Sequence, residues 1–228
     1  MRVILHLSKN KVPISNPRSH ALSRLHKWFG RNNEIHNEQS FYTFSDIWGK
    51  DSTSKDGVLD FPNGGKFVFS SNDTGLISKI LFAIDQDSEF IFGMKVIGRD
   101  YVVFDPSADF GDYFLFQSPI HLTQKSAEIG SKNKSITFKD TNSSDVMTHI
   151  MKLKMDKAGV NSEGFSIAFD TKSPSKRTHV WKHSDNKKLV LNYCPVIING
   201  TNEQKIFCLD VGVGKSTGTG LGCIKPTK

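Results

Sequence analysis

Short apolar strands and amphipathic helices alternate along the first 104 residues of the chain. Apolar side chains recur every three or four positions over residues 19–35, which is the spacing of one face of an α-helix. A second helix is expected over residues 74–85, where Asn72 or Asp73 can cap the first turn. Strands are expected around these helices, over residues 2–7, 41–47, 66–70 and 90–104. The resulting order, β-α-β-β-α-β, is that of a ferredoxin-like unit.

The first expected helix has one apolar and one basic face. Its buried stripe is predicted to contain Leu22, Leu25 and Phe29. The same rotation places three basic side chains mainly on the solvent side: Arg24, Lys27 and Arg31.

A second series of segments in the same order fills the rest of the chain. Helices are expected over residues 144–157 and 203–209, with Gly159 ending the first of them. Strands are expected over residues 113–123, 136–139, 165–170, 189–198 and 221–225. The sequence therefore predicts an α+β protein with two tandem ferredoxin-like, or RRM-like, units over residues 1–109 and 110–228.

Composition narrows the class of protein. Of the 228 residues 37% are hydrophobic, which is enough for packed cores, and no apolar run approaches the roughly 18 residues of a membrane span. Lys9 and Lys11 interrupt the short apolar start, so no secretory signal is expected. Three cysteines without a C-x-x-C pair favour a reducing compartment and supply no zinc-binding pattern. We expect a cytoplasmic protein with no membrane partner.

Positive charge is concentrated in two segments. Residues 1–36 carry seven basic side chains and one acidic one, and residues 172–188 carry six and one. Residues 37–171 have a net negative charge. Because each basic side chain that neutralises a phosphate releases a counterion, two such segments indicate a nucleic-acid partner. Either segment alone is equally compatible with a solvated basic surface.

A cluster of glycines near the C-terminus is the clearest local motif: Gly212, Gly214, Gly218, Gly220 and Gly222. Glycines let a backbone approach a phosphate closely, while Lys215, Ser216 and Thr217 add charge and hydrogen-bond donors. The motif is not a P-loop, because Leu209 stands where that motif requires its first glycine. The motif is not a dinucleotide-binding fingerprint either, because Thr217 stands where that pattern requires its third glycine. We predict an anion-binding loop, with a purely structural glycine-rich hairpin as the alternative.

These features together resemble the CRISPR-associated endoribonucleases that cut repeat RNA into guides, the sixth Cas family. The resemblance covers essentially the full chain and is sharpest in four segments: residues 35–45, 67–73, 116–120 and 212–222. It implies a metal-independent ribonuclease without a cofactor, with CRISPR repeat RNA as its partner and His36 as the catalytic base. Some relatives add a tyrosine and a lysine at positions that fall here near His26-Lys27 and at Ser40. The identity of the second catalytic group therefore stays open.

The chemistry of metal-free RNA cleavage requires a base, an acid and cations. A 2′-hydroxyl must lose a proton, the departing 5′-oxygen must gain one, and cations must stabilise the extra phosphate charge. Histidine suits both proton transfers, because its ordinary pKa of about 6.5 lies near the working pH. Of the eight histidines, the family position at the exit of a basic helix selects His36 as the predicted base. His26 is the runner-up and the candidate acid, and Lys27 and Arg31 either stabilise the phosphate or only solvate the helix.

The RNA is expected to cross the cleft between the two units. The predicted contacts come from the two basic segments and the glycine loop: Arg18, Arg24, Arg31, Lys176, Arg177, Lys182, Gly212, Gly214, Lys215, Ser216, Thr217, Gly218 and Gly220. The predicted reaction leaves a 2′,3′-cyclic phosphate and a 5′-hydroxyl. One alternative is a non-catalytic repeat-RNA-binding module of the same fold. Another is an enzyme that uses the glycine loop for a nucleotide. Among partners, a homodimer and an effector complex that receives the product remain open.

Overall fold

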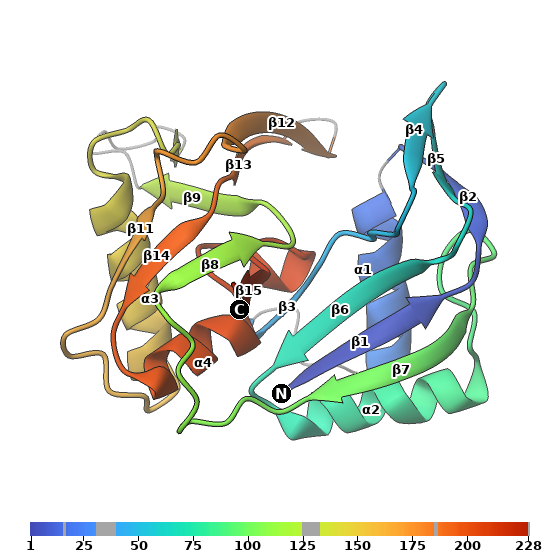
Figure 1. The fold of residues 1–228 in the computed structure, drawn as a ribbon, viewed down its shortest axis with the longest axis horizontal. Coiled ribbons are helices and arrows are strands. Elements are labelled where there is room, and N and C mark those ends of the chain that lie inside the picture. Colours follow the sequence, from blue (N-terminus) through green and yellow to red (C-terminus); the bar gives the residue numbers. More distant parts are fainter. Residues whose placement is uncertain (16, 31–39, 125–132, 185–186, 228) are drawn as a thin grey trace.

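Two four-stranded antiparallel sheets, each backed by a pair of helices, form the frameworks of two units (Figure 1). The computed structural model describes residues 1–15, 17–30, 40–124, 133–184 and 187–227. The first sheet has the strand order β3-β6-β1-β7 and the second has the order β11-β14-β8-β15. Numbered within each unit, both orders are 2-3-1-4, the ferredoxin-like arrangement. The predicted fold class, two tandem ferredoxin-like units, is confirmed.

The N-terminal unit follows the predicted order of elements. Its sequence is β1 (Arg2–Leu7), α1 (Pro17–Phe29), β3 (Tyr42–Phe44), β6 (Gly65–Ser71), α2 (Thr74–Gln86) and β7 (Val96–Val102). Helix α2 begins at Thr74 because the Asp73 side chain accepts a hydrogen bond from the Gly75 N–H at 2.7 Å. Helix α1 ends at Phe29, before Gly30 at φ +96°, and residues 31–35 of the predicted helix lie outside the described residues.

The buried face of α1 also differs from the prediction. Leu25 and Phe29 are buried as expected, but Ala21 and Trp28 complete the stripe and Leu22 is only half-buried. The bulky indole of Trp28 stacks on Phe90 at a centroid distance of 5.8 Å, which draws this face of the helix inward.

A small sheet that the sequence did not predict adjoins the N-terminal unit. It consists of β2 (Asn10–Pro13), β5 (Val58–Phe61) and β4 (Thr53–Lys55), in that order. Its outer strand, Thr53–Lys55, is fully exposed and polar. Such a strand lacks the apolar alternation by which strands are predicted.

The C-terminal unit repeats the order of the first. It contains β8 (Tyr113–Phe116), α3 (Ser143–Lys157), β11 (Ser166–Phe169), β14 (Val196–Asn199), α4 (Asn202–Val211) and β15 (Ile224–Pro226). Thr201 and Gln204 form a capping box that starts α4. Gly159, at φ +72°, lies just beyond the end of α3, as predicted.

A further sheet extends the C-terminal unit and corrects two predicted strands. It contains β10 (Lys134–Ile136), β9 (Ile120–Gln124), β13 (Lys187–Tyr193) and β12 (Arg177–Ser184), in that order. The expected strands over residues 113–123 and 189–198 are each divided between two sheets. The divisions fall at Pro119 and Pro195, where the chain lacks an N–H for the sheet ladder and turns from one sheet into the other.

The strand β12 was also missed, because residues 172–188 were predicted to connect two strands. It is an outer strand of its sheet, and its exposed residues 177–180 do not alternate between buried and exposed positions.

Each unit has its own hydrophobic core. Phe67 and Phe69 are fully buried in the first core, and Phe114 and Ile198 in the second. In the part of the chain that the structure describes, no helix is long and apolar enough to cross a membrane.

Candidate functional site

The glycine loop, residues 212–222, packs at the interface between the two units. It follows α4 and lies against β3 and β9, and Gly212, Gly214, Gly218 and Gly220 are all buried. A Cβ at Gly220, where φ is +78°, would collide with the Phe44 ring. Close packing accounts for these glycines, across the seam at Gly212, Gly218 and Gly220 and within the C-terminal unit at Gly214. Their contact with RNA stays a prediction.

The part of the loop that faces solvent lines a basic pocket of about 450 Å³. Lys215 is half-buried and Ser216 is exposed. The pocket is completed by Ser40, just before β3, and by the side of α3, and its full described lining is Ser40, Ile150, Leu153, Lys154, Lys157, Lys215, Ser216 and Thr217. The structure thus brings three predicted loop residues together with two lysines that the sequence analysis missed. We call this the lysine pocket.

Lys154 is the most unusual of these lysines. It is only 3% exposed, and its Nζ donates a hydrogen bond to the Thr217 hydroxyl at 3.1 Å. Thr217 in turn donates to the Ser40 carbonyl oxygen at 3.4 Å, which links α3, the loop and the start of β3. Burial lowers the pKa of Lys154 to about 7, because desolvation disfavours the ammonium form. A sequence signal existed: Lys154 stands in the apolar stripe of α3, three residues after Met151.

A second pocket, of about 750 Å³, adjoins the lysine pocket along α3. The two share Ile150, Leu153 and Lys215. The second pocket is bounded by the end of β9 and by the exposed side chains of Asp145 and His149. The two pockets together form a continuous depression on this side of the C-terminal unit.

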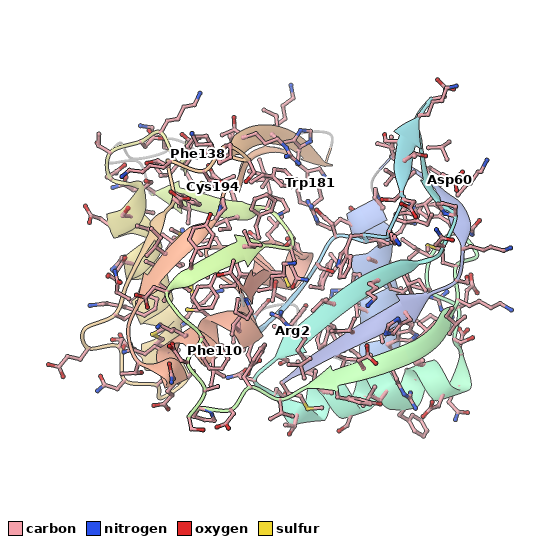
Figure 2. The ribbon with its side chains drawn as sticks, viewed as in Figure 1. Arg2, Asp60, Phe110, Phe138, Trp181 and Cys194 are labelled. Atoms are coloured by element: carbon pink, nitrogen blue, oxygen red, sulfur yellow. The ribbon has the colours of Figure 1, made fainter. Side chains whose placement is uncertain are left out.

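A cleft of about 580 Å³ lies between the two units. Arg18, on α1, lies over the Trp181 ring at 5.0 Å, and its Nε donates to Asp46 Oδ1 at 3.2 Å. Figure 2 shows Trp181 on the side of the C-terminal unit that faces the N-terminal unit. Arg177 lies over the Tyr193 ring at 4.5 Å within the same cleft. Two predicted RNA contacts, Arg18 and Arg177, are therefore placed on aromatic surfaces that the sequence analysis did not single out.

Two other predicted residues, Arg24 and Lys27, line none of the three pockets. Arg24 was expected on the solvent side, but its side chain is only 11% exposed and pairs with Asp87 at 3.0 Å and with Glu89 at 3.5 Å. This ion-pair network draws Arg24 against the loop after α2, so the solvent-side prediction is wrong. Lys27 is exposed and pairs with Asp87 at 3.2 Å.

The structure also places several of the other predicted site residues, namely the histidines and the remaining basic residues. His26 is half-buried, with its ring edge-on to Phe29 at 5.9 Å. Lys176 donates to the Ser173 carbonyl oxygen at 3.2 Å. Lys182 belongs to β12, but its side chain is outside the described part of the structure. His36 and Arg31 also lie outside the described residues.

Arg2, at the start of β1, also connects the two units (Figure 2). Its guanidinium donates to the carbonyl oxygens of Leu209 at 2.9 Å and Ile224 at 2.7 Å, and to the Ser70 hydroxyl at 2.7 Å. Because Leu209 lies in the last turn of α4, the cation also meets the negative end of the helix dipole.

The described residues contain no group of three histidine, cysteine or acidic side chains that could hold a metal ion.

These features define the chain as a tandem ferredoxin-like protein whose units are joined through a glycine-rich loop. Comparison with solved structures finds the same fold over the entire chain. A protein named CRISPR associated protein Cas6 aligns with a TM-score of 0.83 at 14% identity, covering 100% of this chain and 99% of the other. A Cas6-related protein from Pyrococcus furiosus aligns with a TM-score of 0.81 at 18% identity, covering 100% and 98%.

A third solved structure is an RAMP protein described as binding different RNA substrates. It aligns with a TM-score of 0.82 at 18% identity and covers 100% of both chains. No protein-family model matches the sequence, and no curated protein matches it. At these identities the likeness establishes the fold.

Proposed function

We propose that the protein is an endoribonuclease that cuts CRISPR repeat RNA into guide RNAs. The observation that carries the proposal is the lysine pocket, a basic cavity built where the glycine loop meets β3 and α3. Ser40, which lines this pocket, follows His36 by four residues in the sequence. The fold supports the proposal, because the similar structures include two that are named as Cas6 or Cas6-related.

The proposed reaction is metal-independent transesterification. His36 takes the proton of the 2′-hydroxyl, which attacks the adjacent phosphorus, and the 5′-oxygen leaves with a proton from a general acid. The products are a 2′,3′-cyclic phosphate and a 5′-hydroxyl. His26 is the proposed acid, while Lys27 and Arg31 remain proposed partners of the phosphate. Cations are needed there because negative charge increases in the transition state.

We propose that the cleft between the units holds single-stranded RNA. Arg18 with Trp181, and Arg177 with Tyr193, offer cations and aromatic surfaces together. Unpaired bases stack on such surfaces, and the arginines supply phosphate contacts. Lys176 and Lys182 belong to the same proposed surface. Homodimerisation and delivery of the product to an effector complex stay predictions from the resemblance.

The proposed reaction is tested with purified protein and repeat RNA in excess chelator. Cleavage should continue, and the upstream product should carry a cyclic phosphate or the 3′-phosphate that forms when it hydrolyses. A 2′-deoxy substitution at the cut site should stop the reaction, because it removes the nucleophile. Cleavage of the deoxy substrate, or complete loss of activity in chelator, would contradict this mechanism.

A non-catalytic RNA-binding module is the second candidate. It is favoured by one observation, that an RAMP protein binding different RNA substrates has the same fold over its full length. Tight binding of repeat RNA without cleavage under any of these conditions would select this candidate.

A further inference from the structure

Lys154 is a buried cation without a matching acid. In the described parts of the chain, no acidic side chain forms an ion pair with it, and its hydrogen-bond partner is the Thr217 hydroxyl. Lysine is almost never fully buried unless it is paired, because taking an ammonium group out of water is costly. The ammonium form of Lys154 therefore lacks a counter-charge among the described residues, and an anion from outside the chain would supply one.

The cavity beside Lys154 has the chemistry of an anion site. Its described lining supplies three ammonium groups, from Lys154, Lys157 and Lys215, and three hydroxyls, from Ser40, Ser216 and Thr217. This lining includes no carboxylate; Asp145 belongs to the adjoining pocket. Charged donors and hydroxyls around one cavity suit the oxygens of a phosphate group.

The framework around the cavity is rigid. The backbone N–H of Lys215 donates to the His121 carbonyl oxygen at 2.8 Å, and the N–H of Gly220 donates to the Thr217 carbonyl oxygen at 2.9 Å. A Cβ at Gly214 would lie 2.6 Å from the His121 carbonyl oxygen, so the loop is pressed directly against β9. The loop backbone and the Lys154–Thr217 pair are therefore held in place before a ligand arrives, which reduces the entropic cost of binding.

We propose that Lys154, with Lys157 and Lys215, forms a phosphate-binding site for the backbone of bound RNA, in which the Lys154 ammonium pairs with a phosphodiester oxygen. The assignment of RNA as the source of the phosphate rests on the proposed function. The depression that continues along α3 from this site can accommodate a strand longer than one nucleotide. A free mononucleotide is the other source of the same chemistry.

The other charged and titratable groups around Lys154 do not replace such a ligand. Cys208, on α4, acts on Lys154 electrostatically, but burial raises the pKa of its thiol to about 12, so it is neutral near pH 7. Lys157 and Lys215 carry the same sign as Lys154 and so supply no counter-charge to its ammonium form. An incoming phosphate would supply that charge and would raise the pKa of Lys154.

The test compares Lys154→Met with Lys152→Met, which makes the same charge change on the same helix outside both pockets. Binding is measured with an oligouridine and with repeat RNA carrying a 2′-deoxy group at the cut site, so that cleavage plays no part. Lys154→Met should weaken both affinities about 10- to 100-fold, the usual effect of losing a hydrogen bond to a charged group. Millimolar AMP should not displace the RNA; full displacement would overturn RNA as the ligand.

In the proposed site, replacing the buried ammonium of Lys154 with the apolar side chain of Lys154→Met should leave the thermal midpoint unchanged or raise it. If Lys154 only stabilised the fold, the same replacement would lower the midpoint. Unchanged RNA affinity in Lys154→Met, relative to Lys152→Met, would overturn the proposal. Should Lys154→Met fail to fold, the exposed Lys157→Met decides instead, and an affinity equal to that of Lys152→Met would again overturn it.

The outcomes also separate this inference from the proposed function. Loss of oligouridine affinity in Lys154→Met, in a protein that cuts no repeat RNA, would support the site and refute the nuclease. Normal cleavage and binding by Lys154→Met would support the nuclease and refute the site.

Discussion

The guanidinium of Arg18, on the first helix, lies 5.0 Å from the ring centre of Trp181, on the outer strand of the C-terminal unit. This contact spans the cleft between the units, and Asp46 holds the same arginine from the N-terminal side. An aromatic ring beside a cation at the wall of a cleft is a suitable stacking surface for an unpaired base.

Trp181→Ala should therefore weaken the binding of single-stranded RNA by roughly 5- to 100-fold, the usual effect of losing one stacked base. Trp48→Ala is the matched control, because Trp48 is also a partly exposed tryptophan beside a basic side chain but does not line the cleft. Fluorescence anisotropy with a labelled RNA measures both variants. Equal RNA affinities of Trp181→Ala and Trp48→Ala would show that the cleft does not bind the RNA.

Replacing Lys176 and Arg177 together with alanine should reduce the salt dependence of RNA binding. The slope of log affinity against log salt should fall by about 0.7 for each phosphate of a single strand that the protein no longer neutralises. Lys79→Ala with Lys95→Ala is the control, since both lysines are exposed on the N-terminal unit and line none of the three pockets. A slope that matches the control would show that this basic segment is only a solvated surface.

Gly220→Ala should destabilise the fold by about 2–4 kcal/mol, because the new Cβ would meet the Phe44 ring and the backbone would be strained. Gly111→Ala separates these two causes. Gly111 also has a positive φ, +60°, but a Cβ there would have no neighbour within 4 Å. We expect the control to lose only about 1–2 kcal/mol, from backbone strain alone. Urea unfolding measures both; a similar loss in the two variants would contradict the packing role of Gly220.

His36→Ala should lower the single-turnover rate of repeat-RNA cleavage by roughly 100-fold or more, with little change in affinity, because only proton transfer is lost. His26→Ala should have a smaller effect. Cleavage at saturating enzyme separates rate from binding. A normal rate in the His36 variant would remove it as the base and would make His26 the better candidate.

The free energy of unfolding should rise with pH between about pH 7 and pH 8.5. Lys154 has a pKa of about 7 in the folded chain against an ordinary value of 10.5. Between these values the unfolded chain holds a proton that the folded chain has lost, so raising the pH favours folding by at most about 1.4 kcal/mol per pH unit. Denaturant titrations should show this rise in the natural chain and its absence in Lys154→Met. Identical pH profiles would contradict the lowered pKa.

The buried thiols set the upper limit of that pH window. Burial raises the pKa of Cys194 and Cys223 to about 11 and that of Cys208 to about 12, against an ordinary value of 9.0. Above pH 9 the unfolded chain loses thiol protons that the folded chain keeps. The free energy of unfolding should therefore fall there in the natural chain and in Lys154→Met.

Hydrophobic periodicity was sufficient to predict the fold, because the strands and helices of both units carry their own local apolar patterns. It failed at β12, an outer strand in which the exposed residues 177–180 do not alternate between buried and exposed positions. It also failed at Pro119 and Pro195, because a local apolar run does not show that the chain leaves one sheet for another.

The candidate site was less predictable, because its geometry depends on contacts between distant residues. The role of Gly220 is determined by Phe44, which precedes it by 176 residues and belongs to the other unit. Lys154 could have been noticed as a charged residue within an apolar stripe, but its partner Thr217 lies in a loop 63 residues away.

The glycine loop, residues 212–222, has two structural roles. It packs against β3 of the other unit, and it supplies Lys215, Ser216 and Thr217 to the lysine pocket. Hinge motion that parted the units at this seam would separate Ser40 from Thr217 and dismantle the basic cavity. Nor could either half, produced alone, contain it. The lysine pocket therefore exists only while the two units stay packed against each other.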